Sequence, residues 1–344
     1  MLQFPLSVKT LFADGNHNAF PSACRFRNRL YLAFRSGTRH LTFDGVIRLM
    51  VSEDEGAHWR ELETLRADGD LRDPRLAVIS GALHLFSGMR TPLPAKQWRV
   101  ETRHWISADG LRFREAALHG LCPGTFLWSI ASRNHLHVGA GYLHDLRTGN
   151  QLATLYRSVD GIRWEHWLDL RTPGNETALA FGEDGALCGI IRNETPPYFL
   201  PTFFSISPGG RTKYHQMKLP LQGVMLQSAG RRFLVASRRW DAPGRRNLRC
   251  ELFHCNRCGE LSPLAILPSG GDCAYATAVK QSDGQLLLFY YSSHRHLFAA
   301  GTDGDPEHTL PADIFSVLLP NDGSTGAGDA GEPALCEFQT LQLR

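Results

Sequence analysis

Acidic, tyrosine and arginine side chains recur in this sequence beside short apolar runs. Glu176 stands directly before the run at 177–181, and Arg192 closes the run that follows it. Tyr275 lies at the head of a further apolar run. A carboxylate transfers protons, an activated phenol attacks electrophilic carbon, and a guanidinium binds a carboxylate through two parallel hydrogen bonds. A fold that brings these three kinds of side chain together is therefore suited to group transfer on an anionic ligand.

Arginine dominates the basic residues of the chain. The 344 residues include 37 Lys and Arg against 34 Asp and Glu, which gives a formal net charge of +3, and 32 of the basic residues are Arg. This positive charge is spread along the sequence and forms no concentrated patch or stripe. Nucleic-acid binding is therefore not expected, because proteins that bind nucleic acids usually show such a patch.

The composition is that of a globular protein, with 42% hydrophobic and 21% charged residues. The longest uninterrupted apolar run, Leu286 to Tyr291, has six residues, whereas a helix that spans a membrane needs roughly 20. No membrane segment is expected. Residues 1–20 lack the basic stretch and apolar core of a secretory signal peptide. We expect a cytoplasmic location, or a secreted or periplasmic one if a signal was removed.

Short apolar runs recur about every 50 residues with a similar alternating pattern. They lie at 29–35, 82–90, 135–142, 186–192, 231–239 and 285–293. Helical spacing of apolar residues is almost missing, whereas alternating runs bounded by Gly, Asp and Pro are frequent. Each interval holds four short strands, and a radial array of such units protects its sheet edges. We therefore predict an all-β fold, a six-bladed β-propeller with four antiparallel strands per blade, over residues 1–320.

Three segments receive separate predictions. Residues 321–344 are expected to form a Gly-rich linker and a C-terminal tail. The Pro-rich segment 196–201 is expected to be a loop at the rim of a pocket or a packed connector. Cys255 and Cys258 have the spacing of a metal-binding pair, but a structural zinc site needs four ligands and usually a second pair. We interpret that segment as a hairpin turn.

One turn motif occurs three times. Ser52 to Trp59 has the form S-x-D-x-G-x-x-W, and shorter versions lie at 107–113 and 158–164. The Asp side chain bonds backbone amides and the Gly takes a positive φ, as a tight turn requires. These turns resemble the Asp-boxes, or BNR repeats, of the sialidase (neuraminidase) superfamily of six-bladed propellers, and the resemblance covers nearly the whole chain. In that family the boxes lie away from the active site, which implies a structural role.

The repeat also predicts which residues face the pocket. In such a propeller the innermost strand of each blade begins at the pocket face, and the second strand ends there. The starts fall at 18–19, 72–73, 128, 175–176, 222–223 and 272–275, and the ends fall at Arg35, Arg90, Tyr142, Arg192, Arg238 and His294. Several arginines and a few carboxylates should converge on one site. Besides Arg192, the candidates for substrate binding are Arg35, Arg72, Asp73 and His294.

The resemblance implies roles for individual residues. Tyr275 is similar to the nucleophilic tyrosine of the last blade, and Glu176 to the glutamate that takes its proton. A neutral phenol suits an anomeric carbon that bears a carboxylate, because an anionic nucleophile would be repelled. Asp44 lies in the loop that carries the acid/base aspartate, although Asp44-Gly45 is also a strong turn dipeptide. Asp73 and His40 are competing candidates for the proton transfer.

The arginine clamp of the family is only partly matched. Arg192 and Arg246 resemble two of the three arginines that bind the substrate carboxylate. The third normally opens the first inner strand, and Ala19 stands in its place. Arg35 or Arg72 is a neighbouring candidate for the missing charge. The substrate is therefore open among an N-acetylneuraminic acid, a related nonulosonic acid, a uronic acid and another sugar.

The leading hypothesis is an exo-glycosidase of the sialidase type that hydrolyses a terminal, anionic sugar with retention of configuration. No metal or organic cofactor is required by this chemistry. One alternative is a glycan-binding propeller without catalysis, which the residue at position 19 favours. Another is an inverting hydrolase or lyase on a different acidic sugar, with Asp73 or His40 in proton transfer. A carbohydrate is the expected partner in each case, and no oligomeric state is predicted.

Overall fold

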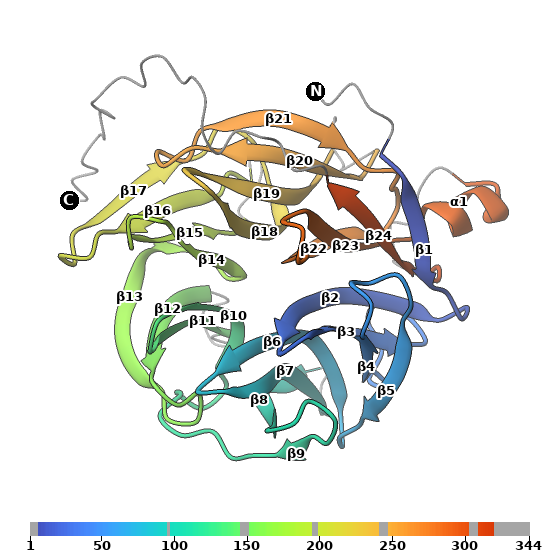
Figure 1. Cartoon of the computed structure of the whole chain (residues 1–344), viewed down its shortest axis with the longest axis horizontal. Helices are drawn as coiled ribbons and strands as arrows, with labels where there is room; N and C mark the ends of the chain where they lie inside the picture. The colour runs from blue at the N-terminus through green and yellow to red at the C-terminus, as the bar shows by residue number, and fades with distance from the viewer. Residues whose placement is uncertain are drawn as a thin grey trace.

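The computed structural model describes residues 6–94, 97–144, 151–194, 199–240, 247–302 and 309–319. These residues form six sheets of four antiparallel strands, arranged as a ring around a central axis (Figure 1). The first strands of neighbouring blades contact one another around that axis. The predicted all-β fold, a six-bladed propeller, is confirmed. Residues 321–344, predicted as linker and tail, lie outside the described residues.

Blades 1 to 3 are formed by consecutive strands. Blade 1 contains β2 (His17–Phe26), β3 (Arg29–Gly37), β4 (Val46–Ser52) and β5 (Arg60–Leu65). Blade 2 contains β6 (Asp70–Ile79), β7 (Ala82–Leu93), β8 (Gln97–Ser107) and β9 (Arg114–Glu115). Blade 3 contains β10 (Phe126–Arg133), β11 (Leu136–His144), β12 (Gln151–Ser158) and β13 (Glu165–Pro173).

Blades 4 to 6 complete the ring. Blade 4 contains β14 (Thr177–Phe181), β15 (Leu187–Ile191), β16 (Thr202–Ile206) and β17 (Thr212–Gln216). Blade 5 contains β18 (Gln222–Ala229), β19 (Arg232–Arg239), β20 (Arg249–Cys255) and β21 (Leu261–Ile266). Blade 6 contains β22 (Cys273–Lys280), β23 (Leu286–Ser292), β24 (Asp313–Leu319) and β1 (Val8–Phe12). The six apolar runs noted in the sequence are the second strands of the six blades.

The N-terminal strand closes the ring, which the sequence pattern did not predict. β1 pairs with β24 in an antiparallel register that includes Val8 with Val317 and Thr10 with Phe315. Its hydrogen bonds satisfy the outer edge of β24, and both ends of the propeller chain are thereby held in one blade (Figure 1). An edge strand left unpaired would offer free backbone groups to other chains.

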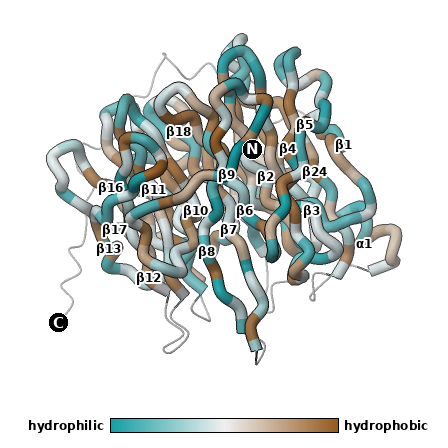
Figure 2. The backbone as a smooth tube through the Cα atoms, turned by 90° about the horizontal axis from the view of Figure 1, so that it is seen from below, coloured by the Kyte–Doolittle hydropathy of each residue, from teal (hydrophilic) through white to brown (hydrophobic). Residues whose placement is uncertain are grey.

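Apolar side chains from adjacent blades form the core. The largest cluster contains residues of blades 1, 3, 5 and 6, and its fully buried members include Phe34, Phe289 and Tyr290. Each such ring contributes about 1.5–3 kcal/mol through burial. Seen from the side, hydrophobic stretches run along strands such as β18 (Figure 2). The core therefore lies between the sheets, and the loops at the strand ends remain for function.

The three repeated turns join the third strand to the fourth in blades 1, 2 and 3, at the opposite end from the starts of the first strands. In the third of them, Gly161 N–H donates to Ser158 Oγ at 2.8 Å, and Asp160 Oδ1 accepts from the backbone N–H groups of Ile162 and Arg163, both at 2.8 Å. The other two turns repeat the Ser-to-Gly contact and the carboxylate contact. Each turn is thus held by its own hydrogen bonds, at the end of the blade away from the starts of the first strands.

A hairpin turn in blade 5 and a short helix in blade 6 lie at the ends of strands. The segment that joins β20 to β21 is a hairpin turn, in which Asn256 N–H donates to Glu260 O at 3.0 Å and Gly259 N–H to Asn256 O at 3.1 Å. The seven-residue helix α1 (His294–Ala300) follows β23. In the part of the chain that the structure describes, no helix has the length and apolar character needed to cross a membrane.

Candidate active site

Five of the six first strands share one irregularity near their beginning. β2, β6, β10, β18 and β22 each shift register there, which is the mark of a β-bulge. Four of these bulges hold a residue with a positive φ: Phe20 (59°), Asp73 (51°), Gly223 (58°) and Tyr275 (46°), which follows Ala274 (113°). A bulge bends the strand and redirects a side chain. The bulges bring Phe20 and Tyr275 together, with ring centroids 5.0 Å apart.

Tyr275, Glu176 and Arg192 form a hydrogen-bonded group at the centre of the ring. The Tyr275 hydroxyl donates to the Glu176 carboxylate, whose oxygens lie 3.0 and 3.2 Å away. Arg192 Nη1 lies 2.8 Å from Glu176 Oε2 and 3.2 Å from the Tyr275 oxygen. The three residues are 8%, 8% and 9% exposed. Glu176 and Arg192, at the start of β14 and the end of β15, therefore meet a side chain of the sixth blade.

The burial of this group sets its protonation. Burial raises the pKa of Glu176 to about 7, with Arg192 opposing the rise and Asp73 and Glu194 adding to it. Burial also raises the pKa of Tyr275 well above its usual value, and the negative charge of Glu176 adds to the rise. The phenol is therefore neutral at physiological pH, and the carboxylate beside it exchanges its proton near neutrality. This pairing suits general-base activation of the phenol.

Aromatic rings and one glycine fix the orientation of Tyr275. Its ring meets Trp128 edge-on at 5.6 Å and lies parallel to Tyr291 at 6.1 Å. Gly223, at the bulge of β18, faces it closely, since a Cβ at that position would lie 2.8 Å from the Tyr275 ring. The positive φ of Gly223 and this close approach both exclude a larger residue.

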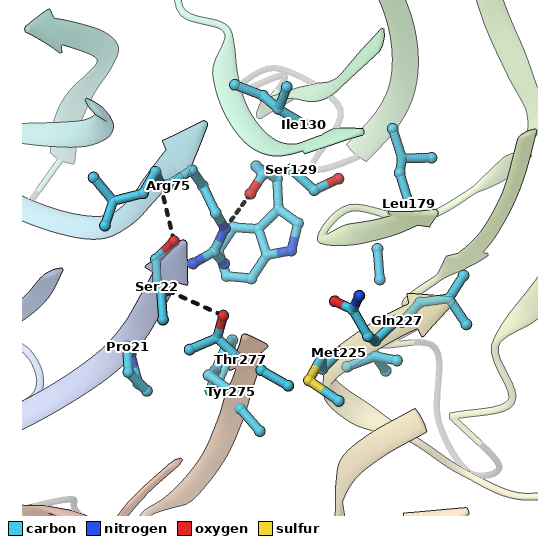
Figure 3. A pocket seen from close by; sticks show the side chains of 18 residues that line it. Pro21, Ser22, Arg75, Ser129, Ile130, Leu179, Met225, Gln227, Tyr275 and Thr277 are labelled. Atoms are coloured by element: carbon cyan, nitrogen blue, oxygen red, sulfur yellow. Dashed lines mark hydrogen bonds between the residues drawn. The ribbon is translucent and has the colours of Figure 1, made fainter. Parts of the chain in front are cut away.

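A cavity of about 180 Å³ lies at the centre of the ring below Tyr275. The first strands of all six blades line it, and Figure 3 shows Ser22, Arg75, Gln227 and Thr277 pointing into this region. The Arg75 guanidinium lies 4.5 Å from the Trp128 ring and donates to the Trp128 carbonyl. Backbone N–H groups of neighbouring strands donate to the two hydroxyls, at 2.9 Å for Ser22 and 3.1 Å for Thr277. The hydroxyls thus tie adjacent blades together beneath the site.

Arg72 borders the site and Arg35 does not. Arg72 is 8% exposed, lies 5.1 Å from the Phe20 ring and donates to Asp73 at 3.1 Å. Arg35 is fully buried and donates to Asp70 at 2.7 Å. Its other amino groups bond the loop that follows β3. Arg35 therefore supports the loop, and of the two arginines considered as replacements for the clamp, Arg72 is the one at the centre.

Asp272 is a buried carboxylate that holds four other side chains. One oxygen accepts from Arg238 Nη2 at 2.7 Å and from the Tyr291 hydroxyl at 2.8 Å. The other bonds His17 Nε2 at 2.8 Å and His40 Nδ1. Favourable contacts outweigh burial and hold the pKa of Asp272 well below its usual range.

Three side chains of this cluster are of types that bind metal ions. His17, His40 and Asp272 are the one group of three metal-ligating side chains found among the described residues. The Asp272 carboxylate already accepts hydrogen bonds from a guanidinium and a phenol. A cation there would lie beside the positive charge of Arg238. The arrangement suits the positioning of side chains better than the binding of a metal ion.

Asp44 lies in the expected loop but is turned to the backbone of that loop. It is exposed and accepts from Thr38 N–H at 3.1 and 3.3 Å and from the Thr38 hydroxyl. Partial burial would raise its pKa, but hydrogen bonds from Thr38 and Thr42 lower it overall. In the interactions found for the described residues, Asp44 contacts neither Tyr275 nor Glu176.

Of two further candidates, His294 and Arg246, the structure describes only the first. His294 begins α1, where its ring packs on Phe315 of β24 at 4.8 Å and its Nδ1 bonds Ser292 Oγ at 3.0 Å. This places the imidazole against the outer part of blade 6. Arg246 lies outside the described residues, as do residues 195–198 of the Pro-rich segment.

Four residues of the site had no role assigned from the sequence. Arg238 lies 5.6 Å from the Tyr275 ring and bonds Asp272, which in turn bonds His17. The fourth residue, Phe20, contacts the Tyr275 ring. Arg238, Asp272 and Phe20 fell within or beside the strand ends predicted to face the pocket. No pattern in the sequence indicated the bulges. A bulge changes which of the residues near the start of a strand points toward the centre of the ring.

Comparison with known proteins shows the fold and leaves the family open. No family model matches the sequence, and no curated protein matches it. Among solved structures, the chain is similar to the phage phi92 endosialidase, with a TM-score of 0.68, 10% identity, and coverage of 98% of this chain and 72% of that one. At 10% identity, this similarity shows a shared fold and nothing more specific.

Two other solved structures are similar. A Trypanosoma rangeli sialidase in complex with the inhibitor DANA gives a TM-score of 0.63 at 12% identity, over 89% of this chain and 56% of that one. A Penicillium chrysogenum α-L-arabinanase complexed with arabinobiose gives 0.62 at 13%, over 92% and 99%. The chain spans little more than half of the trypanosome protein. Propellers of this shape thus occur in glycosidases for acidic and for neutral sugars.

Proposed function

We propose that this protein is a retaining exo-glycosidase in which Tyr275 is the nucleophile and Glu176 its base. The observation that carries the proposal is the contact between the two: a neutral phenol, 8% exposed, donates to a carboxylate at 3.0 Å, at the centre of a six-bladed propeller. A tyrosine that only packs in the core needs no carboxylate partner with a raised pKa. Perturbed titratable pairs of this kind are typical of catalytic sites.

The proposed reaction has two steps. In the first, the Tyr275 oxygen attacks the anomeric carbon while Glu176 takes the phenolic proton, and the bond to the leaving oxygen breaks. In the second, water attacks the same carbon, the bond to Tyr275 breaks, and Glu176 returns the proton. Two displacements at one carbon retain its configuration. A second proton-transfer group, among Asp44, Asp73 and His40, serves the leaving oxygen and the water.

The charges around Tyr275 support an anionic sugar of the sialic or nonulosonic acid type. Arg72, Arg192 and Arg238 are 8%, 9% and 7% exposed and surround the Phe20 and Tyr275 rings. Guanidinium groups recognise carboxylates by paired hydrogen bonds. Arg246 remains a further candidate for this clamp from the sequence.

The test uses a panel of 4-methylumbelliferyl glycosides of N-acetylneuraminic acid, other nonulosonic acids, uronic acids and arabinofuranose. We expect hydrolysis of an acidic member, retention in the first-formed product by NMR, and loss of turnover in Tyr275→Phe and Glu176→Gln. A fluorinated glycosyl fluoride should leave a covalent adduct on the peptide that contains Tyr275. Parent-like rates in both variants would overturn the proposal.

A glycan-binding propeller without catalysis is the second candidate. It is favoured by Ala19, which is fully buried and presents no guanidinium where the first inner strand begins. The mutual contacts of Tyr275, Glu176 and Arg192 weigh against it. Binding on a glycan array together with no turnover of any panel member would select this candidate.

A further inference from the structure

We propose that His40, oriented by Asp272, is the group that exchanges protons with the leaving oxygen and the attacking water. This inference rests on the function proposed above, because it supplies the second proton-transfer group of that reaction. It replaces Asp44 in that role. Three features support this role: the loop at 38–45, the carboxylate that bonds the imidazole, and the aromatic rings between the imidazole and Tyr275.

The loop at 38–45 is built to hold one conformation. Arg35 donates from Nη1 to the Arg39 carbonyl at 3.0 Å and from Nη2 to Thr42 Oγ1 at 3.1 Å. Asp44 accepts from both the backbone and the side chain of Thr38. The guanidinium and the carboxylate thus act as internal supports of the loop. The residue that this framework presents toward the centre of the ring is His40.

Asp272 fixes the imidazole of His40 through one nitrogen. The carboxylate bonds His40 Nδ1, and it is itself held by Arg238 at 2.7 Å and Tyr291 at 2.8 Å. Nε2 lies on the other side of the ring, so proton exchange with a substrate runs through Nε2. The His40 side chain is 15% exposed, whereas that of Asp272 is 0% exposed. A buried carboxylate that orients a more exposed imidazole is an arrangement suited to acid/base catalysis.

His40 belongs to the same aromatic group as the nucleophile. Its ring meets Phe20 edge-on at 5.3 Å, and Phe20 meets Tyr275 edge-on at 5.0 Å. His17 meets His40 at 5.2 Å from the other side. Phe20 therefore separates the imidazole from the phenol by the thickness of one side chain. A sugar bound above Phe20 would have the two groups on either side of its anomeric centre.

The competing carboxylates have other partners. Asp73 is paired with Arg72 at 3.1 Å, and Asp44 is exposed and bonded to Thr38. Among the described residues, the charged and titratable groups that act on His40 include Asp272, Arg72 and His17. Burial lowers the pKa of His40 to about 3, while Asp272 opposes the change. The imidazole of the free protein is thus the base form at neutral pH, which is the form that activates water.

The proton balance closes over the two steps. In hydrolysis of the glycosyl-Tyr275 intermediate, His40 Nε2 takes a proton from water as the water oxygen bonds to the anomeric carbon and the bond to Tyr275 breaks. In formation of the intermediate, His40 first takes up a proton from solvent, and Nε2 gives it to the departing oxygen, which keeps the electron pair of the broken bond. The proton that Nε2 takes from water in the hydrolysis step returns to solvent. No co-reactant other than water is needed.

The test follows the intermediate with the 4-methylumbelliferyl glycoside that the parent protein hydrolyses. An activated aryl leaving group needs little protonation, so formation of the intermediate should continue in His40→Gln while its hydrolysis slows by roughly 10²-fold or more. Intact mass spectrometry should then show a glycosyl adduct that the parent does not accumulate. Sodium azide should restore turnover and yield a glycosyl azide, a readout that only folded protein gives. His58→Gln, which changes a histidine whose side chain is 91% exposed in blade 1, is the matched control.

Three outcomes separate this inference from the proposed function. Adduct and azide rescue in His40→Gln, with a smaller effect of the same kind in Asp272→Asn, support the inference. Parent behaviour of His40→Gln, or the adduct and rescue in Asp44→Asn instead, overturns it while the Tyr275 reaction stands. Turnover that survives in Tyr275→Phe overturns the proposed function and the inference with it.

Discussion

The two ends of the blades differ in how far their residues repeat from blade to blade. At the turn end, the three S-x-D turns repeat the same hydrogen bonds, in which the Gly backbone N–H donates to the Ser hydroxyl and other backbone N–H groups donate to the Asp carboxylate. At the pocket end, the bulges of four first strands carry four different residues: Phe20, Asp73, Gly223 and Tyr275. The repeated turns therefore stabilise the fold, and the candidate site lies at the bulges, where the residues differ from blade to blade. Function is argued from such sites and not from the fold.

The largest expected effect is at the pocket end. Tyr275→Phe removes the oxygen that attacks the sugar and leaves the ring packed against Trp128 and Tyr291. We expect kcat to fall by a factor on the order of 10³ or more, because covalent catalysis is lost, while the free energy of unfolding changes by about 1 kcal/mol for one hydrogen bond. Steady-state kinetics and thermal unfolding measure the two quantities.

Tyr214→Phe is the matched control for that variant. Tyr214 lies on β17, the outer strand of blade 4, and packs against Phe204 at 6.3 Å. Its kcat should equal that of the parent. A similar loss in both variants would mean that the phenol of Tyr275 has no special role, and the distinction between the two ends would fail.

Trp164→Ala should show the reverse pattern at the turn end. Trp164 is 2% exposed, donates from Nε1 to Gly161 O at 3.1 Å and packs against Phe86. Removal of a buried Trp costs about 3–5 kcal/mol of stability. The kcat of the folded protein should stay unchanged. Denaturant unfolding combined with active-site titration separates the two effects, and a fall in kcat without a fall in stability would contradict the structural role.

The fold could be predicted because its signals are local and repeated. Alternating apolar runs and S-x-D turns are set by residues within a few positions of one another. The apolar runs recur in all six blades, and the turns recur in three of them. The strand starts that carry Glu176 and Tyr275, and the strand end that carries Arg192, follow from that register. The closing strand β1 could not be predicted, because its partner β24 lies some 300 residues away in the chain.

The rest of the site depends on contacts between distant residues. His40 is held by Asp272, 232 positions later, and Arg35 by Asp70, 35 positions later. No local pattern shows that the loop at 38–45 points His40 inward and turns Asp44 toward Thr38. The bulges are equally hidden, since neither Phe20 nor Asp73 is a residue that favours a positive φ as glycine does.

A smaller effect on kcat should distinguish alanine substitutions at two glycines that both have a positive φ. Gly223 (58°) faces the Tyr275 ring at the pocket end, and Gly210 (80°) lies in the turn between β16 and β17 with no atom within 4 Å of its Cβ position. Alanine at either site costs about 1 kcal/mol through the backbone. Gly223→Ala should in addition lower kcat roughly tenfold or more by displacing Tyr275. Equal activity in the two variants would show that the position of the ring is not critical.

The smallest expected effect is a shift in pH dependence. Glu176 must be ionised to take the phenolic proton, and burial raises its pKa to about 7. Below that pH the protonated fraction grows, so kcat/KM should rise with pH up to about 7 and then reach a plateau.

Two negative charges help to raise the pKa of Glu176, so their removal should lower it. Asp73 and Glu194 both disfavour ionisation of Glu176. Asp73→Asn and Glu194→Gln should therefore move the rising limb of kcat/KM toward lower pH. Glu194 should have the smaller effect, because its side chain is 43% exposed and solvent screens its charge. Asn tolerates the positive φ at position 73, so the backbone of the bulge should be kept. A rising limb that stays in place in both variants would show that the titrating group is not Glu176, and the base would have to be sought elsewhere around the bulges.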